Sequence, residues 1–282
     1  MNVETKNVLT EKCLQFRHDL IDLLHDIQTG HPGGSLSCTE ILTTLYFNVM
    51  NTNPLNPQEE GRDRLILSKG HAAPMLYLNL AEKGFFPKSE LKTLRQINSN
   101  LQGHPCLHKT PGVELSTGPL GLGLGAGVGM ALGERLKGSK AYIYVLLGDG
   151  EIQEGAIWEA AMAASKFSTF NCIAILDHNG VQLDGTNDEI MPMGDIASKW
   201  RAFGWNVVQC DGHDVSAFAN AIGEAKSERQ KPTIIICETI KGKGISFMEG
   251  KNIWHGKPIS DDEYKQAKAE LGGTNSGQEN SN

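Results

Sequence analysis

Short apolar runs alternate along this chain with longer segments of helical periodicity, and no other feature restricts its fold as strongly. The runs are rich in β-branched residues and nearly continuous, which is typical of strands buried on both faces of a parallel sheet. They cover residues 65–67, 141–147, 172–176, 205–208 and 233–237. Helical patterns cover residues 20–27, 120–136, 154–167, 196–203 and 215–226. This order predicts an α/β fold, a parallel sheet with helices on both faces.

The length and charge of the chain indicate how many domains it has and exclude some classes of binding partner. We expect residues 1–271 to form one domain and residues 272–282 to form a polar, disordered tail. The formal net charge is −7, so the basic balance of a nucleic-acid-binding protein is missing. The N-terminus has no apolar signal segment, and the longest uncharged apolar stretch, 118–133, is too short and too rich in glycine to span a membrane. We therefore expect a cytoplasmic protein that binds neither nucleic acid nor a membrane.

One carboxylate and one amide stand where two successive strands are expected to end. Asp149 follows the run 141–147, between Gly148 and Gly150, and Asn179 follows the run 172–176. In parallel sheets, ligands bind beyond the carboxyl ends of the strands, and bare glycine backbone there leaves room for a phosphate. Mg²⁺ takes such oxygen ligands together with phosphate oxygens. The alternative is that Asp149 only caps the helix that follows it.

The spacing of these residues resembles the thiamine diphosphate-binding signature, in which GDG is followed by a helix, a strand and an asparagine. Here 28 residues separate Gly150 from Asn179. The resemblance implies that Asp149 and Asn179 bind a divalent metal through their side chains and that Val181 binds it through its carbonyl oxygen. The metal, Mg²⁺ or in its place Ca²⁺ or Mn²⁺, would bridge the cofactor diphosphate, with Gly148 and Gly150 beside it.

Five further segments resemble transketolases, in transketolase order and over nearly the whole chain. They are GHPGG at 30–34, RDRLILSKGHAAPMLY at 62–77, QGHP at 102–105, STGPLGLGLGAGVGMA at 116–131 and KGKGISFMEGKNIWHG at 241–256. The chain is therefore similar to the diphosphate-binding part of that family. The resemblance implies thiamine diphosphate as the cofactor and the parallel-sheet fold of thiamine diphosphate enzymes.

Four histidines of these segments gain a role from the resemblance. It implies that they line the substrate channel and the cofactor diphosphate, and that two of them, His71 and His255, bind the cofactor directly. The four are His31, His71, His104 and His255. A histidine can move protons near neutral pH, which suits chemistry on sugar hydroxyls. The other five are expected to be structural or exposed: His18, His25, His108, His178 and His213.

The resemblance also assigns roles to two groups of neighbouring residues. Gly118, Pro119 and Leu120 would hold the cofactor at its waist. Glu154 and Glu159, on the helix after GDG, would lie at a subunit interface and help link two active sites through carboxylates and water. From the residue pattern alone, these two acids indicate an ordinary solvated helix face.

The resemblance further implies a partner chain. Thiamine chemistry needs a glutamate that activates the cofactor, and complete transketolases take it from a second, pyrimidine-binding domain. Because no such domain is found in this sequence, we expect the diphosphate-binding subunit of a split transketolase. A C-terminal subunit with that domain and glutamate would complete each site, in a heterotetramer. The implied reaction moves a two-carbon glycolaldehyde unit from a ketose phosphate, or a related ketose, to an aldose.

Three alternatives remain open at this stage. Other thiamine diphosphate enzymes share GDG and the asparagine, among them the α subunit of 2-oxoacid dehydrogenases and a fragment of deoxyxylulose phosphate synthase. The histidine segments and GPLG favour transketolase over both. A noncatalytic protein that binds only cofactor or partner is the third alternative. The glycine run 121–129 never completes G-x-G-x-x-G, so a nicotinamide site is not expected, and we interpret the run as a helix that packs tightly.

Overall fold

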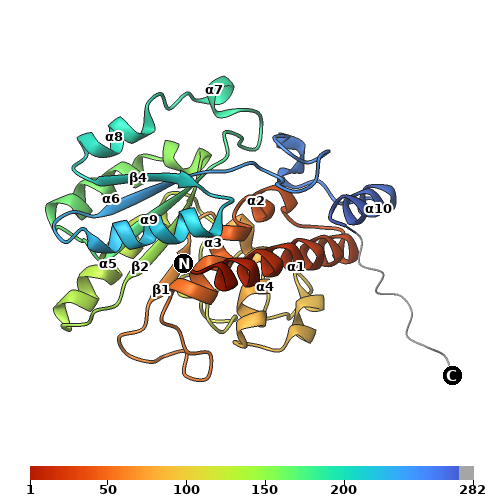
Figure 1. Cartoon of the computed structure of the whole chain (residues 1–282), viewed down its shortest axis with the longest axis horizontal. Coiled ribbons are helices and arrows are strands. Elements are labelled where there is room, and N and C mark those ends of the chain that lie inside the picture. The colour runs from red at the N-terminus through yellow and green to blue at the C-terminus, as the bar shows by residue number, and fades with distance from the viewer. Residues whose placement is uncertain (273–282) are drawn as a thin grey trace.

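One parallel sheet organises the chain in the computed structural model, which describes residues 1–272 (Figure 1). Its strands are β1 (Arg64–Leu67), β2 (Ile143–Gly148), β3 (Cys172–His178), β4 (Asn206–Asp211) and β5 (Thr233–Glu238). Their order across the sheet is β1-β2-β3-β5-β4, and all neighbouring pairs are parallel. The carboxyl ends of the strands therefore meet at one end of the sheet.

Two apolar layers cover the sheet, because side chains along a strand alternate between its faces. In β2, Tyr144 and Leu146 belong to one core, and Val145 and Leu147 belong to the other. The first core contains side chains of α1 (Val3–Ile27), α3 (Thr39–Thr44), α4 (Ala73–Lys83) and α9 (Val215–Ser227). The second contains side chains of α5 (Leu122–Leu136), α6 (Gly155–Lys166) and α8 (Ile196–Ala202). The prediction of a sheet covered on both faces is confirmed.

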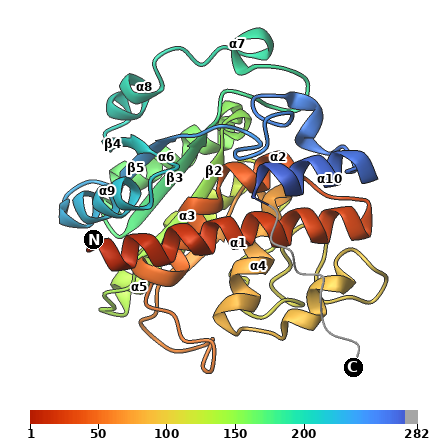
Figure 2. The ribbon, with the colours of Figure 1, turned by 45° about the vertical axis from the view of Figure 1, so that its right-hand side comes forward.

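Shorter helical elements lie in the connections, and a last helix packs beside the first. The short elements are α2 (Pro32–Ser37), η1 (Leu45–Val49), η2 (Gly70–Ala72), η3 (Lys88–Thr93), η4 (Gly150–Gln153), α7 (Asn187–Ile190) and η5 (Asn252–His255). The last helix is α10 (Asp261–Glu270), which lies along the C-terminal part of α1 (Figure 2). There Asp22 Oδ1 accepts hydrogen bonds from Tyr264 Oη at 2.9 Å and from Lys268 Nζ at 2.8 Å.

The observed strands lie close to their predicted bounds. The glycine-rich helix begins two residues later than predicted. We predict this helix over 120–136, but it begins at Leu122, because Gly121 has a φ of +85° and turns the chain into the helix. A Cβ on Gly123 would lie 2.2 Å from Ser68 Oγ. A Cβ on Gly127 would lie 2.4 Å from Val145 Cγ2. The predicted tight packing of this helix is confirmed. Of the predicted tail 272–282, only Gly272 lies within the described residues.

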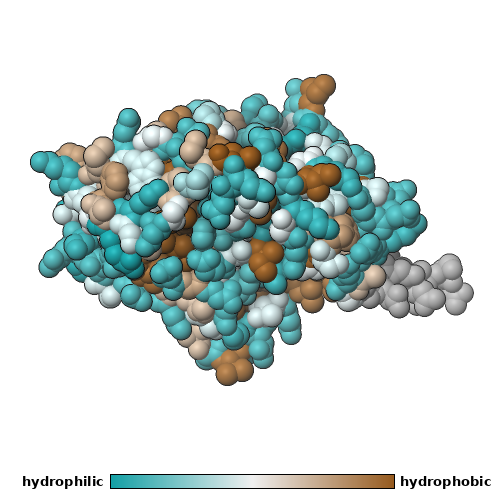
Figure 3. Space-filling model, turned by 90° about the horizontal axis from the view of Figure 1, so that it is seen from above, coloured by the Kyte–Doolittle hydropathy of each residue, from teal (hydrophilic) through white to brown (hydrophobic). Residues whose placement is uncertain are grey.

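The surface of the molecule carries its apolar side chains in scattered positions. The face shown in Figure 3 is mainly hydrophilic, with hydrophobic residues in small separate groups. The most exposed large apolar side chains, Leu55, Ile97 and Leu136, come from three separate segments. Single exposed apolar residues of this kind are ordinary on folded proteins. Within residues 1–272, no helix has the length and apolar character that crossing a membrane requires.

Candidate active site

A cavity of about 250 Å³ opens where the loops after β1, β2, β3 and β5 meet. Nine of the predicted site residues line it: His71, Leu120, Gly148, Asp149, Gly150, Glu154, Asn179, Val181 and His255. These residues come from segments far apart in the sequence, and the parallel sheet brings them together because its strands end at the same place. This convergence makes the cavity the candidate active site.

Asp149 stands at the end of β2 with one carboxylate oxygen engaged and the other available. Its Oδ2 accepts the backbone N–H of Gly180 at 2.5 Å. Its Oδ1 is buried and has no hydrogen-bond partner within 3.5 Å among residues 1–272, and Nε2 of His178 is 3.9 Å away. Burial raises the pKa of Asp149 above its usual value, although the Asn187 side chain is close enough to lower that pKa in part. A buried oxygen without a partner is costly, so this atom points to a cation that would satisfy it.

The loop after β3 offers two more oxygens, both of which already accept a hydrogen bond. Asn179 Oδ1 accepts the N–H of Val181 at 3.1 Å, and the carbonyl of Val181 accepts from Lys241 Nζ at 3.3 Å. Each oxygen keeps a second lone pair for a metal. Within residues 1–272, no three His, Cys, Asp or Glu side chains gather as a metal site. A cation here would depend on a carboxylate, an amide and a carbonyl, a donor set that fits Mg²⁺ together with phosphate oxygens.

A buried ion pair supports this loop, and sequence reasoning missed it. Lys69, just after β1, pairs with Asp177 near the end of β3, and both side chains are almost completely buried. Asp177 also accepts from Ser37 Oγ at 2.5 Å and from Asn179 Nδ2 at 3.3 Å. Lys69 Nζ donates to the carbonyl of Gly34 at 2.9 Å. The pair therefore ties β1, β3 and α2 together directly behind Asn179. Its only sequence signal is the charge of Lys69 and Asp177 at predicted strand ends.

A second buried carboxylate, Glu151, was also missed. Its Oε1 accepts the N–H of Gly121 at 3.0 Å and a hydrogen bond from Ser68, and its Oε2 accepts the N–H of Gly148 at 2.9 Å. Burial raises its pKa above the usual value for glutamate. Glu151 thus joins the start of α5 to the ends of β1 and β2. It fixes the backbone on which Asp149 stands.

Lys241 brings a cation into the cavity that forms no ion pair with a carboxylate of residues 1–272, although Asp177 and Asp149 attract it from a greater distance. Its Nζ lies 3.3 Å from the carbonyl oxygen of Val181, 3.2 Å from that of Gln182 and 3.1 Å from His255 Nδ1. Burial, followed by the charge of Lys69, lowers the pKa of Lys241 to about 8. A buried ammonium without an anionic partner is suited to bind an anion. The sequence segment that contains Lys241 was recognised, but no role for this lysine was predicted.

The four predicted histidines converge from four separate segments. The ring centroid of His31 lies 5.6 Å from that of His71, 6.3 Å from His104 and 5.3 Å from His255, and the rings of His71 and His255 are 4.9 Å apart. Burial, with the Arg95 guanidinium next, lowers the pKa of His31 to about 4. Burial and Lys241 lower the pKa of His255 to about 3. These rings are therefore neutral at pH 7, and each has one nitrogen that accepts a proton and one that donates.

The predicted residues not yet described lie in or beside the cavity, except Glu159 on α6. Gly118, with a φ of +152°, passes so close to His104 that a Cβ there would lie 3.4 Å from the ring. Glu154 is exposed at the cavity mouth, where a Cβ on Gly121 would lie 2.8 Å from its own Cβ. Glu159 is exposed on α6, and Pro119 is exposed beside Leu120; neither lines the cavity.

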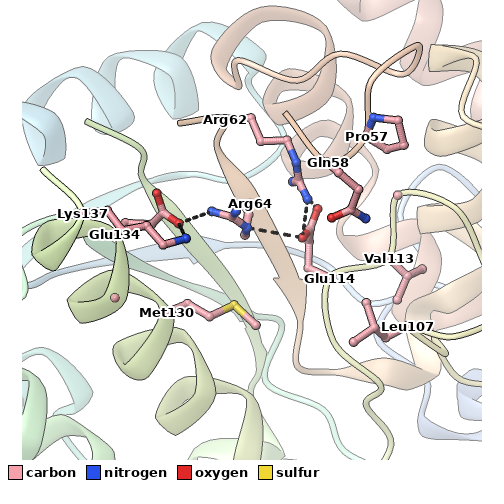
Figure 4. A pocket seen from close by; sticks show the side chains of 12 residues that line it. Pro57, Gln58, Arg62, Arg64, Leu107, Val113, Glu114, Met130, Glu134 and Lys137 are labelled. Atoms are coloured by element: carbon pink, nitrogen blue, oxygen red, sulfur yellow. Dashed lines mark hydrogen bonds and ion pairs between the residues drawn. The ribbon is translucent and has the colours of Figure 1, made fainter. Parts of the chain in front are cut away.

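A second pocket, of about 370 Å³, lies at the opposite, amino end of β1 (Figure 4). Arg62 Nη2 is 2.9 Å from Glu114 Oε2, and Arg64 Nη1 is 2.9 Å from Glu134 Oε1. Lys137 Nζ lies 3.7 Å from the same Glu134 oxygen. Each of the three cations that line this pocket therefore already faces a carboxylate. The two arginines at this end are largely buried in ion pairs, whereas Lys137, whose side chain is 65% exposed, is paired only weakly.

Comparison with known proteins gives findings that agree with one another. The family model described as "Transketolase, thiamine diphosphate binding domain" matches residues 10–278. One subunit of the apulose-4-phosphate transketolase of Phocaeicola vulgatus is 39% identical over 271 residues, covering 96% of this chain and 95% of the relative. The 6-deoxy-6-sulfo-D-fructose transketolase subunit SqwG of Clostridium sp. is 46% identical over 242 residues, covering 86% of this chain and 88% of the relative.

A solved structure agrees with these relatives. A mutant transketolase from Pichia stipitis matches with a TM-score of 0.90 and 33% sequence identity over 94% of this chain, but over only 41% of its own length. The present chain thus spans about two fifths of that enzyme and nearly the whole of the Phocaeicola vulgatus relative.

Proposed function

The chain belongs to the transketolase family, and on that premise we propose that it is the diphosphate-binding subunit of a two-chain transketolase. Residues 1–271 would form the thiamine diphosphate-binding domain. With a partner chain, the subunit would transfer a two-carbon glycolaldehyde unit from a ketose to an aldose. The observation that carries this proposal is the cavity itself, which combines the free oxygen of Asp149, the unneutralised Lys241 and His71 and His255 at one end of the sheet.

The metal site of the proposal is Mg²⁺ held by the side chains of Asp149 and Asn179 and by the carbonyl of Val181. The support is that Asp149 Oδ1 is buried and unpartnered within residues 1–272, while the other two oxygens keep a lone pair. Ca²⁺ or Mn²⁺ would satisfy similar oxygen donors, so the site does not select one metal by its donors alone. Lys241 would donate to the cofactor diphosphate, because its present partners are neutral carbonyls and a neutral imidazole.

The cofactor would lie between the backbone of residues 118–120 and the strand ends. Gly148 and Gly150 would leave room for the diphosphate beside their backbone, and His71 and His255, which line the same cavity, would donate hydrogen bonds to it. When bound, thiamine diphosphate supplies the electron sink that lets a carbon–carbon bond beside a carbonyl break. The neutral His104 would accept and return the protons of the sugar hydroxyls through a ring nitrogen that lacks a proton at pH 7. His31 accepts from Arg95 Nη2 at 3.2 Å through Nδ1, so a neutral His31 would donate to a sugar hydroxyl from Nε2.

The partner of the proposal is a C-terminal transketolase subunit that carries the pyrimidine-binding domain and the activating glutamate. Both relatives above are named as subunits of transketolases, and this chain covers almost all of the one from Phocaeicola vulgatus, which supports a second chain. Glu154 and Glu159, both exposed in the first turns at and after the start of α6, would lie in the interface between subunits. We propose a heterotetramer with two sites, in the cytoplasm.

The substrate is proposed only as a class. The two relatives are named for apulose-4-phosphate and 6-deoxy-6-sulfo-D-fructose, so a ketose with a phosphate or sulfonate end group is the class to test first. The partner would hold most contacts to that end group. The donors to compare are therefore an ordinary pentose phosphate and the two ketoses of these names.

The experiment that tests the proposed function measures ketol transfer with the chain alone, the candidate partner alone, and both together with thiamine diphosphate and Mg²⁺. We expect transfer only in the mixture. Robust transfer by this chain alone would refute the two-chain site. Binding of cofactor by the mixture without transfer from any donor of the class would instead favour a noncatalytic role.

A further inference from the structure

Three polar residues from separate elements, two buried and one half-buried, form a connected group outside the cavity. Arg17 of α1 pairs with Glu40 of α3 through both guanidinium nitrogens, Nη1 at 2.6 Å and Nη2 at 2.9 Å. His213, in the loop after β4, has its Nδ1 3.0 Å from Glu40 Oε2. The exposed fractions of these side chains are 9% for Arg17, 8% for Glu40 and 13% for His213. We call Arg17, Glu40 and His213 the buried triad.

The tautomer of His213 follows from its second contact. Its Nε2 lies 2.8 Å from the backbone nitrogen of Ile240, and a backbone N–H can only donate. Nε2 is therefore the acceptor, and Nδ1 carries the hydrogen that is donated to Glu40. Burial raises the pKa of Glu40, but the hydrogen bond from His213 and the charge of Arg17 outweigh burial and hold that pKa below its usual value. Glu40 is thus an anion that orients His213 toward Ile240.

The buried triad forms hydrogen bonds to the backbone on both sides of Lys241. His213 holds the N–H of Ile240, one residue before Lys241. Arg17 Nε donates to the carbonyl of Lys243, two residues after it, at 3.1 Å. Between these points, Gly242 N–H donates to the carbonyl of Gly33 at 3.0 Å. No member of the triad lines the cavity, whereas Lys241 does.

We propose that the buried triad positions Lys241 in the diphosphate site, and that His213 does so by holding the backbone N–H of Ile240. The inference rests on the proposed function in one respect, since it takes Lys241 as a donor to the cofactor diphosphate. His213 touches neither cofactor nor substrate and is a positioning residue. Holding the backbone on both sides of Lys241 lets a flexible side chain keep one place between Val181 and His255, which lowers the entropy cost of binding an anion.

Two substitutions of His213 separate its contacts. His213→Gln places an amide oxygen near the position of Nε2 and keeps an acceptor for Ile240, while His213→Asn places an amide nitrogen near Nδ1 and keeps a donor for Glu40. We expect the Asn variant to weaken binding of thiamine diphosphate with Mg²⁺ about five- to tenfold, the size expected for one lost hydrogen bond, and the Gln variant to restore most of it. The amide of Ile240 should exchange with deuterium about tenfold faster in the Asn variant only.

A matched control and a double variant make the test specific. His25 also contacts a carboxylate, Asp261 at 2.9 Å, but it lies between α1 and α10, so His25→Asn should change neither readout. In a Lys241→Met background, His213→Asn should weaken cofactor binding by less than about twofold, because the residue it acts through is gone.

Three results would overturn the inference. They are a Gln variant as impaired as the Asn variant, a full effect of His213→Asn in the Lys241→Met background, and unchanged Ile240 exchange in the Asn variant. A wild-type chain that binds no thiamine diphosphate, alone or with its partner, would overturn the proposed function instead. In that case, exchange at Ile240 in the folded variants still decides whether His213 positions this segment.

Discussion

The two ends of β1 both carry charged side chains, but they leave different groups unpaired. At the amino end, Arg62, Arg64 and Lys137 share the two carboxylates of Glu114 and Glu134, so each cation has a carboxylate beside it (Figure 4). At the carboxyl end, Lys241 contacts carbonyls and a neutral ring but no carboxylate within residues 1–272, and Asp149 keeps a buried oxygen without a hydrogen bond from these residues. Buried charge that is left unpaired costs stability, and a protein retains it where a ligand completes the set. We therefore predict that substitutions at the carboxyl end lower cofactor affinity, whereas substitutions at the amino end lower the stability of the fold.

The largest effect is expected from Asp149→Ala. The substitution removes the one carboxylate of the proposed metal site, so Mg²⁺-dependent binding of thiamine diphosphate should fall by more than about a hundredfold in calorimetry. The thermal stability of the chain without ligand should be maintained, because the carboxylate it loses is buried without a cation against it in residues 1–272. Unchanged cofactor affinity would exclude Asp149 as a metal ligand.

Glu114→Ala should show the reverse pattern. It leaves Arg62 buried without its carboxylate, and removal of one partner of a buried ion pair costs about 3 kcal/mol. Urea unfolding should report this loss, while the affinity for thiamine diphosphate, measured where the variant is folded, should match the wild type. A Glu114 variant that loses cofactor binding but keeps its stability would contradict the purely structural role of the amino end.

His104→Ala tests the proposed proton transfer beside the cavity. We expect turnover of the assembled enzyme to fall by about tenfold to a hundredfold, with a smaller change in cofactor affinity, because general acid–base groups act mainly on the chemical step. The measurement compares the fall in turnover with the change in cofactor affinity for the same variant. A variant with weakened cofactor binding and normal turnover would place His104 against the cofactor and away from the sugar.

The last prediction concerns the stability of the chain in mild acid. The pKa values of His31 and His255 in the folded chain are about 4 and about 3, against an ordinary value of 6.5. As the pH falls below 6.5, the unfolded chain takes up protons that the folded chain does not, so stability decreases toward pH 5, above the range in which most carboxylates titrate. Melting temperatures at pH 7 and pH 5 measure this. The variant His31→Gln/His255→Gln should show a weaker dependence; an equal one would assign the effect to other groups.

The sequence predicts the sheet and most of the cavity for a simple reason. Asp149 and Asn179 follow apolar runs, and in a parallel sheet the ends of such runs must meet. Sequence order alone could not reveal the partners of Lys69, Glu151 and Lys241, because a buried charge is recognised by what lies against it from distant parts of the chain, as with Ser68 and Glu151. For His213 the sequence predicts only a structural or exposed role, since nothing nearby indicates Glu40 and Ile240 on its two sides.

The central claim is that the carboxyl end of the sheet holds a diphosphate through a metal and through Lys241. The most direct test is a calorimetric titration of the full chain, alone and with its partner, using thiamine diphosphate and plain thiamine, each with and without Mg²⁺. We predict that only thiamine diphosphate binds tightly and that removal of Mg²⁺ abolishes the tight binding. Equal affinity for plain thiamine, or binding that is indifferent to Mg²⁺, would contradict the claim.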